Sequence, residues 1–254
     1  MNLKEKLRIG KITIGSWITL AHPAIAEIMA KAGFDWLTVD LEHSAITIRE
    51  AEELIRVIDL CGVVPLVRLS ANDPVQIKRV MDAGAHGVIV PMVNTADEAK
   101  KAVEAVRYPP DGTRGVGLAR AQGYGNSFNK YKDWVNRESI VIVQVEHIKA
   151  VENLEAILSV EGVDGFIVGP YDLSGSLGIP GQFDNELMIE AMSKIQSFKK
   201  ASSKISGYHV VEPDIDQLKK RMREGYQFLA YSVDIRMLDT CCRSAIKNIL
   251  YNER

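Results

Sequence analysis

The chain has 254 residues, 46% of them hydrophobic, and a formal net charge of -2 at pH 7. This length and composition suit one domain with a full core, and the absence of a basic cluster with interleaved aromatic residues argues against a nucleic-acid partner. The odd count of 3 cysteines fits no disulfide framework. Without an apolar leader or a run long enough to span a membrane, we expect a soluble cytoplasmic protein.

Short apolar runs rich in β-branched residues alternate with longer amphipathic stretches along the chain. Runs such as VIVPMV and IVIVQVE are nearly continuous in apolar residues, which is typical of strands buried on both faces of a parallel sheet. The predicted strands are residues 12–17, 36–42, 64–69, 87–93, 140–146, 165–169, 205–210 and 228–234.

The stretches between these runs carry helix-capping signals. Thr47 with Glu50 has capping-box spacing, and Thr95 with Glu98 repeats it. Further start and stop signals are Asp73 with Pro74, Gly84, Asp214 and Gly225. Strands that alternate with helices predict a barrel or a doubly wound open sheet. The count of eight strands, and the lack of a Gly-rich dinucleotide fingerprint after the first, favour a (β/α)8 TIM barrel that spans 1–254 as one domain.

The segment 108–134 interrupts this rhythm, because connections in compact domains are usually much shorter. It contains Arg114, Arg120, Tyr124 and Tyr131, a composition that suits a lid or a substrate loop. The alternatives are a misread element and a surface excursion that packs against a neighbouring subunit.

Polar residues at the carboxyl ends of the predicted strands mark the expected site, since active sites of such barrels lie there. Gln144 and Glu146 share one face of their strand because side chains alternate. A buried carboxylate needs a partner, and Asp172 at the end of the next strand is the natural one. We expect this oxygen-rich pair, Glu146 and Asp172, to hold Mg²⁺ or Mn²⁺. The alternative is a salt bridge to Arg68 without a metal.

Two basic side chains are expected near that pair. Arg68 suits a bidentate contact with a substrate carboxylate or an enolate oxygen, although it could instead pair with Glu42 or Asp40. His43 follows Asp40 by three residues, and a nearby carboxylate can fix the tautomer of an imidazole and raise its basicity, as a general base requires. The alternative is a half-buried structural histidine.

Several segments in order resemble the HpcH/HpaI aldolases: FDWLTVDLEHS, VRLSANDPVQIKRVMDAGAHGVIVPMVNTADEA, RYPPDGTRGVG, VQVE and EGVDGFIVGPYDLSGSLG. The resemblance runs from about Gly15 to Asp234. It implies a class II pyruvate aldolase, a lyase that reversibly cleaves 2-keto-3-deoxy sugar acids or 4-hydroxy-2-oxo diacids to pyruvate and an aldehyde. It also implies a divalent metal (Mg²⁺, Mn²⁺ or Co²⁺) and no organic cofactor. No lysine lies at the carboxyl end of any predicted strand. This agrees with a metal-dependent aldolase, because Schiff-base aldolases need such a lysine.

Carried over by position, the resemblance implies a role for each residue of the site. Glu146 and Asp172 would be the metal ligands, and Arg68 would hold pyruvate and stabilise its enolate. His43, oriented by Asp40, would be the base. Further substrate contacts would come from Trp17, Gln144 and the backbone N–H groups of Tyr171 and Asp172.

Two residues depart from the family pattern and bear on the pocket for the aldehyde. Tyr171 replaces a small residue, and His209 falls where an apolar residue is common. The resemblance further implies a homohexamer, a trimer of dimers, with the C-terminal helix exchanged between subunits. The stretch 235–254 is apolar enough at helical spacing to pack on a partner.

Two rival functions stay open at this stage. One is a citrate-synthase-like carbon–carbon condensation, for which Arg114 and Arg120 would help to admit an acyl-CoA. The other is a non-catalytic sugar-acid binding protein, against which the complete set of site residues argues.

Overall fold

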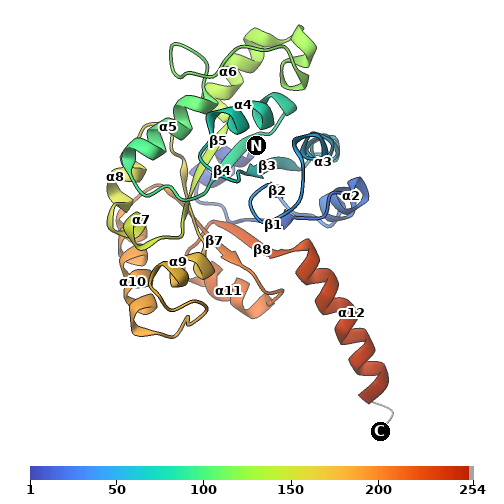
Figure 1. The fold of residues 1–254 in the computed structure, drawn as a ribbon, viewed down its shortest axis with the longest axis vertical. Coiled ribbons are helices and arrows are strands. Elements are labelled where there is room, and N and C mark those ends of the chain that lie inside the picture. The colour runs from blue at the N-terminus through green and yellow to red at the C-terminus, as the bar shows by residue number, and fades with distance from the viewer. Residues whose placement is uncertain (252–254) are drawn as a thin grey trace.

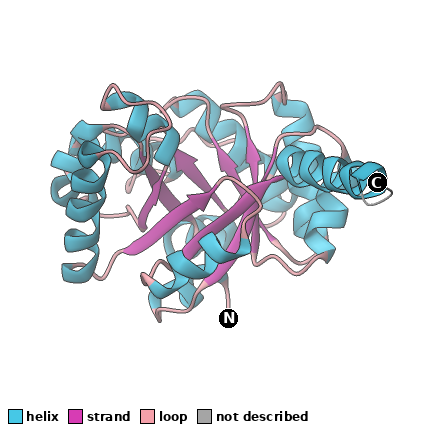
Figure 2. Cartoon of the chain, turned by 90° about the horizontal axis from the view of Figure 1, so that it is seen from below, coloured by secondary structure: helices cyan, strands magenta, loops and turns pink. Residues whose placement is uncertain are grey.

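The computed structural model describes residues 1–251. Within them, parallel strands close into a barrel in the order β1 to β8, with β8 paired to β1. The helices surround the strands, as Figures 1 and 2 show. The predicted (β/α)8 barrel is therefore confirmed. Its strands are β1 Thr13–Ile18, β2 Trp36–Asp40, β3 Val64–Arg68, β4 Gly87–Val90, β5 Ile140–Val145, β6 Gly165–Val168, β7 Ile205–Val210 and β8 Phe228–Val233.

The four helices for which the sequence carries a start signal begin where that signal predicts. Thr47 and Thr95 form capping boxes, Asp73 and Asp214 are N-caps, and Gly84 ends its helix in the left-handed conformation. The helices are α1 Leu3–Arg8, α2 Pro23–Lys31, α3 Ile48–Leu60, α4 Pro74–Ala83, α5 Ala96–Val106, α6 Phe128–Glu138, α7 Ile148–Glu152, α8 Leu154–Ser159, α9 Pro170–Ser176, α10 Glu186–Ala201, α11 Ile215–Arg223 and α12 Asp234–Tyr251, with a 3-10 segment η1 at Arg120–Gly125.

Side-chain alternation along the strands sorts the core from the site. Ile140 and Ile142 of β5 belong to the cluster inside the barrel, whereas Val141 and Val143 pack outward under the helices. At the amino ends of the strands this interior is filled by large rings, among them Trp36 stacked on Phe228 with centroids 4.0 Å apart. At the carboxyl ends, polar side chains from several strands, among them Asp40, Arg68 and Gln144, line a cavity together with Trp17 and Ile167.

The segment 108–134 differs from the prediction. It contains η1 and the beginning of α6, and Ser127, which precedes that helix, makes no side-chain cap hydrogen bond. Arg114 pairs with Asp82 at 2.5 Å and Arg120 with Asp59 at 2.5 Å. Asp59 and Asp82 lie at the carboxyl ends of α3 and α4. These helix ends are on the side of the barrel where the strands begin. The prediction of a lid over the mouth of this chain is therefore wrong.

Helix α12 leaves the barrel and extends away from it (Figure 1). Its start is anchored because the Asp234 carboxylate accepts hydrogen bonds from the backbone N–H groups of Thr19 and Leu20 and from the Thr19 hydroxyl, at 2.6–2.8 Å. Beyond that point its apolar side chains are exposed, namely Ile235, Leu238, Ile246 and Ile249. None of the helices within residues 1–251 combines the length and the apolar character that crossing a membrane demands.

Candidate active site at the barrel mouth

A cavity of about 300 Å³ opens at the carboxyl ends of the strands. Its wall includes every predicted site residue except Glu146: Trp17, Asp40, His43, Arg68, Gln144, Tyr171, Asp172 and His209. A larger cavity of about 540 Å³ surrounds His86 and Trp134 near the amino end of the barrel, and no predicted site residue lines it. The chemistry predicted from the sequence therefore belongs to the smaller cavity.

Asp40 and Arg68 form the most buried ion pair of the mouth. They are register partners on β2 and β3, and Arg68 donates from Nε and Nη2 to the two Asp40 oxygens at 2.9 and 2.5 Å. Burial opposes ionisation of Asp40, but the hydrogen bonds and charge of Arg68 outweigh it and lower the pKa of this carboxyl. The guanidinium also lies 4.4 Å from the ring centroid of Trp17, so it is fixed on two sides.

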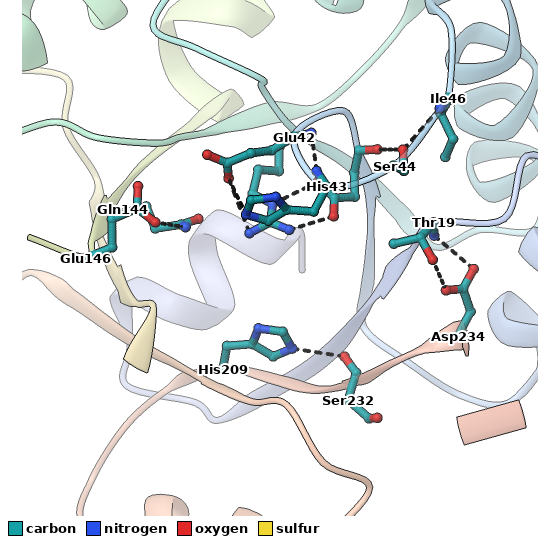
Figure 3. A network of polar contacts seen from close by, with 12 residues as sticks. Thr19, Glu42, His43, Ser44, Ile46, Gln144, Glu146, His209, Ser232 and Asp234 are labelled. Atoms are coloured by element: carbon teal, nitrogen blue, oxygen red, sulfur yellow. Dashed lines mark hydrogen bonds and ion pairs between the residues drawn. The ribbon is translucent and has the colours of Figure 1, made fainter. Parts of the chain in front are cut away.

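His43 stands at the rim with its side chain 60% exposed. Asp40 accepts a hydrogen bond from the backbone N–H of His43 at 3.3 Å, so this acid positions the loop. The ring itself faces a different carboxylate, because Nε2 lies 3.9 Å from Glu42 Oε2. The predicted proximity of His43 and Asp40 is therefore present, but it runs through the backbone (Figure 3).

Glu146 lies beside the cavity, and its two carboxylate oxygens are already hydrogen-bonded. Oε1 accepts from the backbone N–H of Met92 at 2.6 Å, and Oε2 accepts from the Gln144 amide, as the shared strand face predicts. Met92 has a φ of +52°, a backbone conformation that residues other than glycine rarely adopt. This conformation accompanies the hydrogen bond to Glu146. Burial raises the pKa of Glu146 to about 7, and the charges of Glu42 and Asp172 add to that rise.

Glu42 was expected only as an alternative partner of Arg68, and the sequence analysis gave it no role of its own in the site. Burial raises its pKa to about 7, and neighbouring Asp40 and Asp172 add to the rise, although Arg68 opposes it. Its Oε2 atom is 3.3 Å from Arg68 Nη1 yet makes no hydrogen bond within the described residues. The signal was present in the sequence, because Asp40 and Glu42 are two apart, like Gln144 and Glu146.

The donor set fits a hard divalent cation. The charge of Asp172 raises the pKa of both Glu42 and Glu146, and the charge of Glu42 also raises that of Glu146. Within residues 1–251 neither Glu146 nor Asp172 forms an ion pair with a basic side chain. In the same part of the chain, no group of three or more His, Cys, Asp or Glu side chains is arranged to hold a metal by itself. A cation here would therefore take further ligands from water or substrate oxygen, as Mg²⁺ does in proteins.

Helix α9 carries Tyr171 and Asp172 at the mouth. The backbone just before it, at Gly169, passes close to Glu146 at the end of β5. A Cβ at Gly169 would lie 3.3 Å from the Glu146 Cβ, which explains a glycine just before this helix. The Tyr171 side chain is 47% exposed and packs edge-on against Phe183 with centroids 5.0 Å apart. This pair forms an aromatic rim.

The opposite wall of the cavity contains Trp17 and His209. Their rings are 5.2 Å apart, and His209 Nε2 lies 3.1 Å from the backbone carbonyl oxygen of Ser232. Burial lowers the pKa of His209 to about 3, and the positive charge of Arg68 adds to this effect. His209 is therefore a neutral side chain.

A (β/α)8 barrel whose mouth combines buried carboxylates, a fixed arginine and an exposed histidine has the form of an enzyme for small anionic substrates. The chain belongs to the HpcH/HpaI aldolase/citrate lyase family, whose model matches residues 13–240. This family is metal-dependent.

Individual proteins are similar over almost the full chain. The hydroxypyruvate/pyruvate aldolase of Sagittula stellata is 40% identical over 238 residues, 93% of each chain. A 4-hydroxy-2-oxo-heptane-1,7-dioate aldolase of Escherichia coli is 40% identical over 240 residues, 93% of this chain and 90% of that one. The crystal structure of an HpcH/HpaI aldolase/citrate lyase family protein from Burkholderia cenocepacia J2315 superposes with a TM-score of 0.92, at 33% identity and coverage of 97% and 98%.

Proposed function

We propose that this chain is a divalent-metal-dependent pyruvate aldolase, a class II carbon–carbon lyase that reversibly cleaves 4-hydroxy-2-oxo acids to pyruvate and an aldehyde. The observation that carries the proposal is the gathering of Asp40, His43, Arg68, Gln144 and Asp172 around one cavity, with Glu146 directly beside it. The named relatives support the reaction class.

Glu146 and Asp172 are the proposed metal ligands. A bound divalent cation supplies Lewis-acid stabilisation of the enolate that cleavage leaves on the pyruvyl unit. Arg68 has five N–H donors, and Asp40 occupies those of Nε and one of Nη2. The remaining N–H groups of this fixed guanidinium are available to the carboxylate or the enolate oxygen of the substrate. Gln144 and the backbone N–H groups of Tyr171 and Asp172 complete the contacts to the pyruvyl unit.

His43 is the proposed base. Its ring lines the cavity and is exposed, so it can take the proton of the substrate 4-hydroxyl during cleavage and return it during synthesis. Glu42 faces the ring, with its Oε2 atom 3.9 Å from His43 Nε2. Asp40 acts less directly, by holding the His43 backbone and Arg68.

The two arginines expected to admit an acyl-CoA lie away from the mouth of this chain. The acyl-CoA entrance of a citrate-synthase-like condensation would need Arg114 and Arg120 near the mouth. Both lie towards the other end of the barrel and are paired with Asp82 and Asp59. A non-catalytic binding protein would have no need for the exposed base beside a fixed arginine.

The test is release of pyruvate from a panel of 4-hydroxy-2-oxo acids, measured with and without EDTA. We expect EDTA to abolish the release, and Mg²⁺, Mn²⁺ or Co²⁺ to restore it. Glu146→Ala and Arg68→Ala should each lose most of the activity, whereas Glu155→Ala, at an exposed carboxylate on α8, should keep it. Full activity in EDTA, or in either site variant, overturns the proposal.

The assembly is part of the same proposal. The exposed apolar side chains of α12 favour its exchange between two subunits, and three such dimers would make the hexamer that the resemblance implies.

A further inference from the structure

The cavity of about 540 Å³ near the amino end of the barrel is separate from the barrel mouth. It lies between the last turn of α3, the turn that follows α4, and the segment formed by η1 and α6. Among the described residues, none that lines this cavity also lines the mouth cavity. Its volume is within the range of about 300–1,000 Å³ that is typical of pockets for small organic ligands.

Positive charge predominates in the wall of this cavity. Arg56, Arg120 and Lys130 are cationic, and Asp59 is the one acid among the described lining residues. Burial lowers the pKa of His86 against the opposing charge of Asp59, so this ring is neutral at pH 7. The wall therefore attracts a negatively charged ligand.

Arg120 is held in place on the buried side of the cavity. Its Nη2 atom donates to Asp59 at 2.5 Å, and its Nη1 atom donates to the Ala83 carbonyl oxygen at 3.3 Å. A Cβ at Gly84 would lie 2.2 Å from Nη1, so this glycine leaves the space that the guanidinium occupies. Because a guanidinium has five N–H donors, Arg120 keeps donors for a ligand in a fixed orientation.

The other two cations are exposed and free to contact a ligand. Lys130 forms no ion pair within residues 1–251. Arg56 pairs with Glu52 at 3.0 Å on the same helix, and these side chains are 45% and 42% exposed. Exposed pairs of this kind are weak, so Arg56 can exchange Glu52 for a ligand that several cations contact together.

Aromatic rings form the rest of this wall. Tyr131 and Trp134 stack with centroids 5.6 Å apart and their planes at 16°, and His86 meets Trp134 edge-on at 4.9 Å. Trp134 is half-buried, and Tyr124 is 72% exposed, so both present ring surface to a ligand. Rings of this kind bind flat ligands by offset stacking. A small inorganic anion would leave the rings uncovered, and a neutral ring would leave the cations without a partner.

We propose that this cavity binds an organic anion with a planar aromatic ring, with the anionic group beside the three cations and the ring on the surface of Trp134. Nucleotides have this chemistry with a phosphate group, and aromatic carboxylates have it with a carboxylate group. The proposal does not depend on the aldolase reaction, because no residue of the proposed active site lines this cavity.

Titration calorimetry of wild-type protein in the presence of EDTA tests the ligand class. The phosphate arm compares AMP with adenosine and with inorganic phosphate, and the carboxylate arm compares nicotinate with nicotinamide. In one arm the aromatic anion should bind saturably and roughly tenfold or more tightly than the neutral molecule with the same ring. AMP should exceed inorganic phosphate, which lacks the ring. The arm that responds identifies the anionic group.

Variants with exposed substitutions test the place of binding. Arg56→Gln combined with Lys130→Gln should weaken binding of the responding anion by roughly tenfold, as loss of charge-assisted hydrogen bonds predicts. Lys219→Gln, at an exposed position on α11, is the matched control and should bind like wild type. Unchanged affinity in the double variant overturns the proposal. So does wild-type protein that binds neither AMP nor nicotinate, or that binds the neutral ring as tightly as the anion in both arms.

Discussion

The guanidinium of Arg68 donates two hydrogen bonds to the carboxylate of Asp40, at 2.9 Å from Nε and 2.5 Å from Nη2. Both side chains are nearly buried, and the bonds join neighbouring strands at the mouth. A bidentate pair of this kind fixes direction as well as position, so the remaining face of Arg68 is preorganised before substrate arrives.

Breaking this pair should therefore cost stability as well as activity. Asp40→Asn removes the carboxylate that is hydrogen-bonded to Arg68 and leaves Glu42 and Glu146 as its neighbouring acids. Loss of one partner from a buried pair typically costs about 3–5 kcal/mol. Urea denaturation measures the change. The control is Glu190→Gln, which removes the exposed pair with Lys194 and should leave the stability nearly unchanged. An equally small effect of Asp40→Asn would show that the pair is not structural.

Glu42 should contribute to binding of a divalent cation although it is not a proposed ligand. Its carboxylate adds negative charge next to Glu146 and Asp172, and loss of such outer groups typically costs about 10–100-fold in metal affinity. Glu42→Gln should weaken Mn²⁺ binding by roughly tenfold, and Glu146→Gln should weaken it further. Titration calorimetry measures both, with Glu52→Gln on the exposed face of α3 as the matched control. Unchanged affinity in Glu42→Gln would remove this residue from the site.

Local patterns were enough to predict much of this site. Alternation placed Gln144 and Glu146 on the same inward side at the end of β5, and the same rule applied to Asp40 would have found Glu42. The pairing of Asp40 with Arg68 stayed an open alternative, because only the register of β2 against β3 sets the two residues opposite each other. The true neighbour of the His43 ring depends on how the loop after β2 turns, which no periodicity encodes.

Helix α6 shows the other limit of prediction from the sequence. Its buried side chains, Tyr131 and Val135, are few, and the helix starts without a side-chain cap. The preceding Arg114 and Arg120 looked like substrate-binding residues because isolated arginines in a long connection often are. Their partners, Asp82 and Asp59, are remote in sequence and become visible only in the fold.

His209 should make the stability of the protein depend on pH in a defined direction. Its pKa is about 3 in the folded protein against 6.5 for a free histidine, so the unfolded chain binds a proton that the folded chain refuses. Stability is then unaffected above about pH 6.5 and falls as the pH drops below it, by up to about 1.4 kcal/mol per pH unit.

The comparison that isolates this effect is wild type against His209→Phe, by urea denaturation at pH 7.5 and 5.0. Between pH 7.5 and 5.0 the free energy of unfolding should fall by roughly 2 kcal/mol more in wild type than in the variant. The reason is that only unfolded wild type gains a proton at His209. The charges of Arg68 and Asp40 oppose each other at this ring and are present in both proteins. Parallel pH profiles would mean that folding does not lower the pKa of His209.

Helix α12 should decide the assembly of the protein. Ile235, Leu238, Ile246 and Ile249 recur at spacings that place them on one face, and all four are exposed in the single chain. If this face packs on a second copy, Leu238→Glu combined with Ile246→Glu should shift the protein to a smaller species in light scattering coupled to size exclusion. Ser244→Glu, on the opposite face of the same helix, should leave the mass unchanged. Since Asp234 anchors the start of α12 through Thr19 and Leu20, the variants should keep a folded barrel by circular dichroism. An unchanged mass in the double variant would place the subunit contacts elsewhere.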